Sequence, residues 1–319
     1  MQKLLLIISC GLALALRTLA ADEVPAAHGS QAQVGVLDIT CPDSMEAMCR
    51  AWVTAFNQRS PGAGARYTMT DCNPIDRSAI GPNTAEVFSN SNQKYTDKYS
   101  YDPFRVLVSL AAYDLKDKVQ ALGVFVHRDN PLTKITLSQL DAIYSTTRRR
   151  HGKDLTTWGQ LGLTGEWADQ PIHPISRKLS NEVTWHFRDI VMLDGTFKSS
   201  VQQPQKAKSV DVIRALSADR YGIANCAFSY ATAEVKALAL TDSAGVEHQP
   251  SREEVGSGSY PLIRPLYFYV NRVPGKPLEP LVKEFLSFVL SAEGQTIVAQ
   301  DKYFALPPAL ADGERAKLD

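Results

Sequence analysis

Short strand-like runs of apolar residues alternate with helical patterns along this chain, and this alternation constrains the fold more than any other feature. Residues 34–39, 66–70, 104–110 and 122–126 each have the composition of a β-strand. Between the first two runs, apolar residues recur at three- and four-residue steps, as on the buried face of a helix: Met45, Met48, Trp52 and Phe56. The alternation predicts an α/β fold in which a mostly parallel sheet is flanked by helices.

Size and charge exclude several classes of function. A chain of 319 residues is long enough to form two lobes, each with its own core. The 34 basic residues are balanced by 34 acidic residues, so the chain has no net charge. A neutral chain is not typical of proteins that bind nucleic acid or a membrane surface through charge. An anionic ligand must therefore be held by local geometry.

The N-terminus predicts export. Lys3 precedes an apolar run over residues 4–16, and Ala20 and Ala21 offer small residues for cleavage, so we expect a signal peptide over residues 1–21. The run is too short to remain as a membrane span. Cleavage would leave a periplasmic or secreted protein, with a disordered leader over residues 22–33 and, at the other end, a charged tail over residues 309–319.

Cysteine usage fits an oxidising compartment and gives no indication of a metal site. Cleavage would remove Cys10 and leave Cys41, Cys49, Cys72 and Cys226, which allow three disulfide pairings. Cys41 and Cys72 each follow a strand-like run, which favours a pairing across neighbouring strands, but all three pairings remain open. The spacing matches no zinc pattern, so no metal is expected.

The stretch over residues 172–187 is the candidate ligand site. An extended segment delivers Arg177, and a helix then begins near Ser180 and Asn181. Backbone N–H groups at a helix start, a hydroxyl or amide side chain and an arginine together form an anion site in principle. The alternative is an ordinary capped surface helix with a solvated arginine, and such helix starts are much more frequent.

Several segments together resemble the phosphate-specific substrate-binding proteins of ABC transporters, the PstS-like group of periplasmic binding proteins. The segments cover residues 126–132, 135–140, 158–162, 260–267 and 285–295. The resemblance implies a type II fold of two α/β lobes joined by two crossovers, with the ligand in the cleft between them. Lobe 1 would combine residues 34–115 and 255–308, and lobe 2 would span residues 116–254. The crossovers are expected near residues 110–122 and 226–260.

The resemblance also implies site residues in the middle lobe. The family's motif runs Gly-Arg, a short spacer and then Ser-Gly-Thr at a helix start. Here Ser176 and Arg177 correspond to Gly-Arg, and residues 181–183 correspond to the triplet. Arg177 is retained, Asn181 begins the triplet, and Ser180 offers a substitute hydroxyl. Glu182 is an objection to phosphate, because a carboxylate repels an anion.

In the N-terminal lobe the resemblance implies three further loops that supply ligand contacts. The turn before the first helix contains Asp43 and Ser44, the second loop contains Thr70, and the third contains Asn83 and Thr84. Hydroxyl and amide donors are therefore kept at these positions, whereas the family's pattern of charges is not.

These observations predict an exported, monomeric solute-binding protein that takes phosphate or a related small oxyanion, uses no cofactor and has an ABC transporter permease as its partner. One alternative is a degenerate relative whose cleft binds another ligand or whose surface binds a protein. The residues that favour it are Glu182, Asp43, Asp71 and Val183. A second alternative is a phosphatase-type enzyme. Nucleophile-elbow, zinc-protease, P-loop and dinucleotide motifs are absent from the sequence, and His173 and His186 near the central loop pair with no visible nucleophile.

Overall fold

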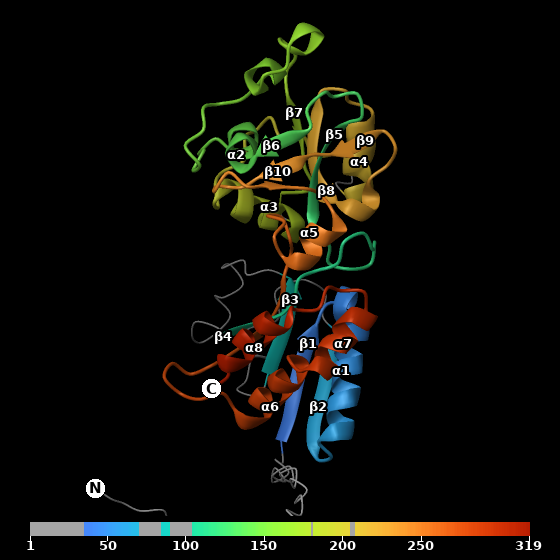
Figure 1. The fold of residues 1–319 in the computed structure, drawn as a ribbon, viewed down its shortest axis with the longest axis vertical. Coiled ribbons are helices and arrows are strands. Elements are labelled where there is room, and N and C mark those ends of the chain that lie inside the picture. The colour runs from blue at the N-terminus through green and yellow to red at the C-terminus, as the bar shows by residue number, and fades with distance from the viewer. Residues whose placement is uncertain (1–34, 70–83, 90–103, 180, 205–207) are drawn as a thin grey trace, which may run out of the picture. The chain divides into compact units, whose positions relative to one another are not determined.

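Two separate hydrophobic cores organise the chain, and each is built around its own β-sheet. The first core draws its buried side chains from residues 37–119 and 266–318, and the second from residues 121–262. The computed structural model describes residues 35–69, 84–89, 104–179, 181–204 and 208–319. The ribbon in Figure 1 shows these elements in the order in which the chain visits them.

The first core is an α/β unit in which helices cover a five-stranded sheet. Its elements are β1 (Gly35–Cys41), η1 (Asp43–Met45), α1 (Glu46–Arg59), β2 (Ala63–Met69), β3 (Thr84–Ser89), β4 (Phe104–Ser109), β12 (Leu266–Val270), α6 (Pro280–Val289), α7 (Ala292–Gln300) and α8 (Pro308–Ala316). The apolar periodicity of α1 is used for packing, because Met48, Trp52 and Phe56 are all buried in this core. Phe56 meets Phe285 of α6 edge to face at 5.2 Å between ring centroids.

The first sheet has the strand order β2-β1-β3-β12-β4. Strand β1 pairs in parallel with β2 and β3, whereas β12 pairs antiparallel with both β3 and β4. The sheet therefore agrees with the mostly parallel arrangement predicted from the alternating pattern, with β12 as the strand that runs against the others. Strand β12 is inserted late in the sequence, so it brings the C-terminal part of the chain into the first core.

The second core contains a four-stranded sheet, a three-stranded sheet and several short helices. Its elements are β5 (Leu122–His127), β6 (Lys134–Thr136), α2 (Leu137–Tyr144), η4 (Trp158–Leu161), η5 (Gly165–Trp167), β7 (His173–Ile175), α3 (Glu182–Met192), α4 (Ser209–Ser217), β8 (Gly222–Ala227), η6 (Phe228–Tyr230), β9 (Val235–Ala237), β10 (Ala239–Thr241), β11 (Glu247–His248) and α5 (Arg252–Ser257).

The four-stranded sheet of the second core corrects the expectation of a mostly parallel sheet. Its order is β7-β8-β5-β9, and β8 pairs in parallel with β7 but antiparallel with β5, which is also antiparallel to β9. Leu122, at the start of β5, lies opposite Ala227, at the end of β8. The chain enters this sheet at the start of β5 and comes back to the same edge at the end of β8. The two strands therefore run in opposite directions.

The chain passes between the two cores through two connections, residues 110–121 and residues 263–265. The first connection spans the segment expected as a crossover near residues 110–122, and its residues Leu110, Ala112 and Val119 pack in the first core. The second lies after the segment expected, because Cys226, Val235, Leu240 and Tyr260 all pack in the second core. Residues 226–260 are therefore part of that core and not a crossover, and the passage is made by only three residues.

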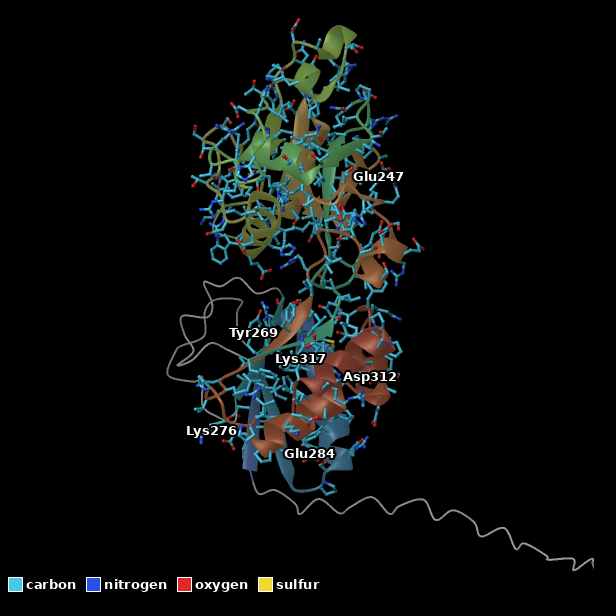
Figure 2. The ribbon with its side chains drawn as sticks, turned by 60° about the vertical axis from the view of Figure 1, so that its left-hand side comes forward. Glu247, Tyr269, Lys276, Glu284, Asp312 and Lys317 are labelled. Atoms are coloured by element: carbon cyan, nitrogen blue, oxygen red, sulfur yellow. The ribbon has the colours of Figure 1, made fainter. Side chains whose placement is uncertain are left out.

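The segment over residues 309–319 corrects a second expectation, because most of it forms helix α8 and not a charged tail. Ala311 and Leu318 are buried in the first core, and the Glu314 carboxylate accepts a hydrogen bond of 3.1 Å from the backbone N–H of Leu107 in β4. Figure 2 shows Asp312 on this helix and Lys317 directly after it. The charged residues at its exposed positions explain why the sequence alone resembles a tail.

Several sequence predictions lie outside the described residues, namely the signal peptide over residues 1–21, the leader over residues 22–33, and Cys72. In the part of the chain that is described, Cys41, Cys49 and Cys226 are buried free thiols. Among the described helices, none is both long and apolar enough to cross a bilayer.

Leu318→Ala should destabilise the protein by about 2–5 kcal/mol, because Leu318 is 2% exposed and its removal leaves a cavity in the first core. Leu310→Ala, in the helix α8 that precedes Leu318, is the matched control and should change the free energy of unfolding by less than about 0.5 kcal/mol, since Leu310 is 38% exposed. Urea denaturation measures both. Equal, small effects would mean that the segment after α8 does not pack on the first core.

Candidate functional site

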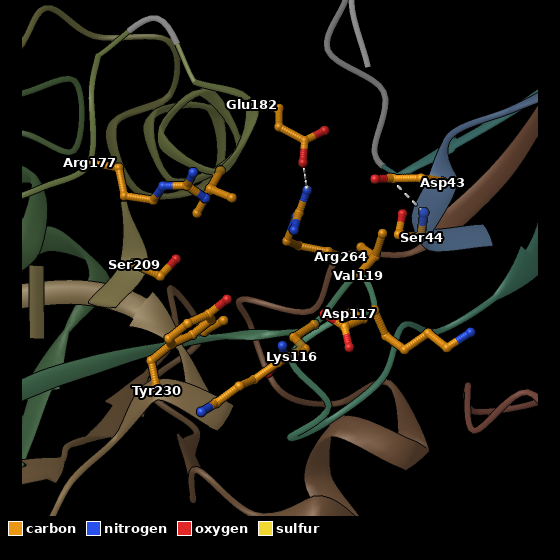
Figure 3. A pocket seen from close by; sticks show the side chains of 14 residues that line it. Asp43, Ser44, Lys116, Asp117, Val119, Arg177, Glu182, Ser209, Tyr230 and Arg264 are labelled. Atoms are coloured by element: carbon orange, nitrogen blue, oxygen red, sulfur yellow. Dashed lines mark hydrogen bonds and ion pairs between the residues drawn. The ribbon is translucent and has the colours of Figure 1, made fainter. Parts of the chain in front are cut away.

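The described residues enclose a pocket of about 470 Å³ to which both cores and both connections contribute. Figure 3 shows its side chains from close by. The residues that line it are Asp43, Ser44, Lys116, Asp117, Lys118, Val119, Gln120, Arg177, Glu182, Val183, Ser209, Ala227, Tyr230 and Arg264. This mixture of hydroxyl groups and charges of both signs suits a small polar ligand.

Arg177 is the predicted site residue with the clearest position in the pocket. Arg177 comes two residues after the end of strand β7. The residue before it, the buried Ser176, donates its backbone N–H to the carbonyl oxygen of Gln202 at 3.0 Å, which fixes the backbone at this point. Burial lowers the pKa of the Arg177 guanidinium from its usual value, while the nearby Cys226 and Glu182 act in the opposite direction. An arginine remains a cation even after such a shift, so Arg177 brings a partly desolvated positive charge to the pocket.

The start of helix α4 lies on the same side of the pocket as Arg177. Ser209 is the first residue of this helix, and Figure 3 shows its hydroxyl group beside Arg177 and Tyr230. The N-terminal end of a helix carries a partial positive charge from its aligned peptide dipoles. Lys116 of the first connection adds a further cation, with its ammonium 5.8 Å from the centre of the Tyr230 ring.

Asp43 and Ser44 reach the pocket from η1, at the end of strand β1. The Asp43 carboxylate accepts a hydrogen bond of 2.7 Å from the backbone N–H of Ser44. The Tyr303 hydroxyl donates to the carbonyl oxygen of Ser44 at 2.8 Å and accepts from the backbone N–H of Val119 at 3.1 Å. One tyrosine therefore fixes both the turn that holds Ser44 and the first connection.

Glu182 is paired inside the pocket, which changes its effect on an anion. Its carboxylate oxygen Oε1 lies 3.0 Å from Nη2 of Arg264, whose side chain is 6% exposed. The charge expected to repel phosphate is therefore balanced by an arginine from the second connection. Sequence reasoning placed Glu182 correctly at the start of the helix but did not find its partner.

The formal charges that line the pocket sum to one positive charge. Arg177, Arg264, Lys116 and Lys118 are opposed by Asp43, Asp117 and Glu182. Lys118 is engaged elsewhere, because its ammonium lies 2.6 Å from the Asp301 carboxylate. Within the described ranges, no group of three His, Cys, Asp or Glu side chains is placed to hold a metal ion.

Of the remaining predicted site residues, Asn181 has a structural function. It is the N-cap of α3, and its side-chain oxygen accepts a hydrogen bond of 3.0 Å from the backbone N–H of Val183. It is absent from the described lining of the pocket. Ser180, Thr70 and Asn83 lie outside the described residues. Thr84 begins β3, where only its backbone is described.

The two histidines near the central loop also lie away from the described lining of the pocket. His173 Nδ1 is 2.8 Å from the Asp219 carboxylate, and His186 is 2% exposed. Burial and the nearby Arg264 cation lower the pKa of His186 to about 3, so this imidazole is neutral at physiological pH. Neither position supports the phosphatase alternative.

Among the lining residues that sequence reasoning missed are Ser209, Lys116, Tyr230 and Arg264. Arg264 carries a local signal, since it stands between Ile263 and Pro265 in an apolar run, where a charge needs a partner. Ser209 precedes Val212, Ile213 and Leu216, whose helical spacing is a local signal for a helix start. Nothing in their local sequence distinguishes Lys116 and Tyr230.

Comparison with known proteins first defines the class. The family model described as a PBP superfamily domain matches residues 119–293. The fold agrees with solved structures that are 16% identical in sequence. PstS from Borrelia burgdorferi covers 85% of this chain and is itself covered over 99%, with a TM-score of 0.58. An ABC-type phosphate transport receptor from Vibrio cholerae has a TM-score of 0.57 over 85% of this chain and 100% of its own. The protein therefore has the two-lobed α/β fold of the periplasmic binding proteins.

Sequence similarity then identifies the family. The phosphate-binding protein PstS of Pseudomonas aeruginosa is 37% identical over 235 residues, which are 73% of this chain and 69% of that protein. The phosphate-binding protein PstS of Staphylococcus aureus is 24% identical over 251 residues, 77% of this chain and 68% of that protein. This chain belongs to the PstS family of phosphate-binding proteins, as the resemblance of its segments indicated.

Acid should destabilise the protein through His186. Below pH 6.5 the unfolded chain binds a proton at this residue, whereas the folded chain binds it only near pH 3, so stability is lost as the pH falls through this window. The loss attributable to His186 at pH 5 is about 2 kcal/mol. His186→Asn should remove this part of the pH dependence of the free energy of unfolding, measured in urea between pH 7 and pH 5.

His151→Asn is the matched control, because His151 is exposed and asparagine tolerates its positive φ of 60°. It should leave the pH dependence as in the wild type. If the His186 variant kept the full acid sensitivity, His186 would not be buried in its neutral form.

Proposed function

We propose that the pocket binds phosphate or a related small oxyanion, with Arg177 as its chief electrostatic contact. The observation that carries the proposal is a partly buried guanidinium that lines a polar pocket beside the N-terminal end of α4. Hydrogen bonds from a guanidinium to an oxyanion are charge-assisted and can be two-pronged. Ser209 and Ser44 supply hydroxyl donors to the same space.

Burial makes Arg177 a stronger anion ligand than an exposed arginine. Its desolvation has already been compensated by the folding of the chain, so the bound anion interacts with a charge that water screens less. The family relation adds independent support, because relatives at 37% and 24% identity are both named as phosphate-binding proteins. Thr70, Asn83, Thr84 and Ser180 remain predicted contacts.

The wider biological role follows as a further part of the proposal. We expect export, as the apolar N-terminal run over residues 4–16 predicts, and delivery of the ligand to an ABC transporter permease. In this role the protein binds and releases its ligand without chemical change.

One observation favours a second candidate, a ligand other than phosphate. The pocket contains the carboxylates of Asp43, Asp117 and Glu182, which disfavour an anion with a double negative charge. A ligand with both an anionic and a cationic group would use both signs of charge. The pairing of Glu182 with Arg264 removes much of this objection, so phosphate stays the preferred ligand.

Arg177→Ala should weaken phosphate binding by at least about 30-fold, because it removes a charge-assisted contact of roughly 2 kcal/mol. Isothermal titration calorimetry of the protein, dialysed free of phosphate, measures the dissociation constant directly. Arg177→Lys keeps the charge but loses the planar fork and should give an intermediate affinity.

The matched control is Arg214→Ala, which removes an arginine of α4 whose side chain is 73% exposed. It should leave the phosphate affinity within a factor of about two, since exposed pairs contribute little. Wild-type protein that shows neither heat nor thermal stabilisation with millimolar phosphate would contradict the proposed function.

A further inference from the structure

Arg264 and Glu182 form an ion pair in which a carboxylate of the chain is the partner of an arginine in the pocket. Arg264 comes from the second connection and Glu182 from the first turn of α3, and both line the pocket. The Arg264 side chain is 6% exposed, whereas that of Glu182 is 36% exposed. The arginine is thus fixed and desolvated, and the carboxylate is the more accessible of the two groups.

The charges of this pair also act on Arg177. Glu182 raises the pKa of Arg177, and the Arg264 cation lowers it, so both groups lie close enough to interact with that guanidinium. Figure 3 shows Glu182 and Arg264 in the middle of the pocket, with Arg177 on one side and Asp43 and Ser44 on the other. The Glu182 carboxylate therefore occupies space near two guanidinium groups, where an oxyanion would find its strongest attraction.

Helix α3 brings the Glu182 carboxylate to Arg264, with Oε1 at 3.0 Å from Nη2. His186, one turn further along the helix, is buried and neutral. A buried guanidinium that loses its counter-ion is costly, so Arg264 needs an anion at every stage of ligand binding. The Glu182 carboxylate, 3.0 Å from Arg264, supplies such a charge in the structure, and an anionic ligand can supply one in its place.

We propose that Glu182 competes with the anionic ligand for Arg264, and that Arg264 is a second anion-binding arginine of the pocket beside Arg177. The inference rests on the proposed function, because it concerns the same anion site. Binding exchanges the contact between Arg264 and Glu182 for one between Arg264 and the ligand. The affinity for the ligand is then lower than the two arginines would give without Glu182. The strength of the contact between Glu182 and Arg264 determines the size of this reduction.

The competition predicts opposite effects of two substitutions. Glu182→Gln preserves the length of the side chain and its hydrogen bond to Arg264 but removes the negative charge. It should therefore lower the dissociation constant for inorganic phosphate by roughly fivefold or more. Arg264→Gln removes the proposed contact and should raise the dissociation constant by roughly tenfold or more.

Glu166→Gln is the matched control for the charge change. Glu166 forms an ion pair of 2.7 Å with Arg220 on the surface of the second core, and both side chains are exposed. This variant should bind phosphate as the wild type does. A gain of affinity in Glu182→Gln is a result that a merely structural function of the pair would not produce, since damage to the fold weakens binding.

The outcomes separate this inference from the proposed function. Wild-type protein that binds phosphate, together with a Glu182→Gln variant that binds it equally or more weakly, overturns the competition and leaves the proposed function intact. Binding by Glu182→Gln but not by the wild type supports the competition and contradicts phosphate as the natural ligand. Binding by neither protein overturns both. If Arg264→Gln does not fold, the comparison of Glu182→Gln with Glu166→Gln decides.

Discussion

The structure depends on the constraint that one chain must pass twice between two cores. Strands β4 and β5 carry the chain out of the first core and into the second, and β12 receives it on return. Each sheet must therefore contain a strand that runs against its neighbours, as β12 does in the first and β5 in the second. The pocket residues Lys116 and Arg264 come from the two connections themselves, so the site is a product of this topology.

The lining of the pocket combines charges of both signs in nearly equal number and has only a small excess of positive charge. The chain as a whole has no net charge, and the pocket contains cations and carboxylates in nearly equal number. Most of these groups have partners within the protein, for example Lys118 with Asp301 and Arg264 with Glu182. The selectivity for an anion then depends on which of these pairs an incoming ligand can replace, a question of geometry and local desolvation.

Sequence patterns predicted the features that are local in the chain. The strands β1 and β5 and the helix α1 were identified from short-range periodicity, because burial of one face repeats within a few residues. The direction of β8 against β5 and the position of the second connection depend on pairings over about a hundred residues, which local periodicity does not contain. Arg177 was found because its motif is local. Arg264 was missed as a pocket residue because its partner Glu182 is 82 positions away.

The residues that border the two connections in the second core are hydrogen-bonded to each other, and this limits how the chain can vary. The backbone N–H of Leu122 donates to the carbonyl oxygen of Leu262 at 2.9 Å, and Ala112 exchanges backbone hydrogen bonds with Val119 and Ala121. Loops usually tolerate insertions, but an added residue between Leu262 and Leu266 would rotate the Arg264 side chain away from α3. The length of this short passage is therefore as closely specified as the register of a strand, and natural variation should accumulate elsewhere.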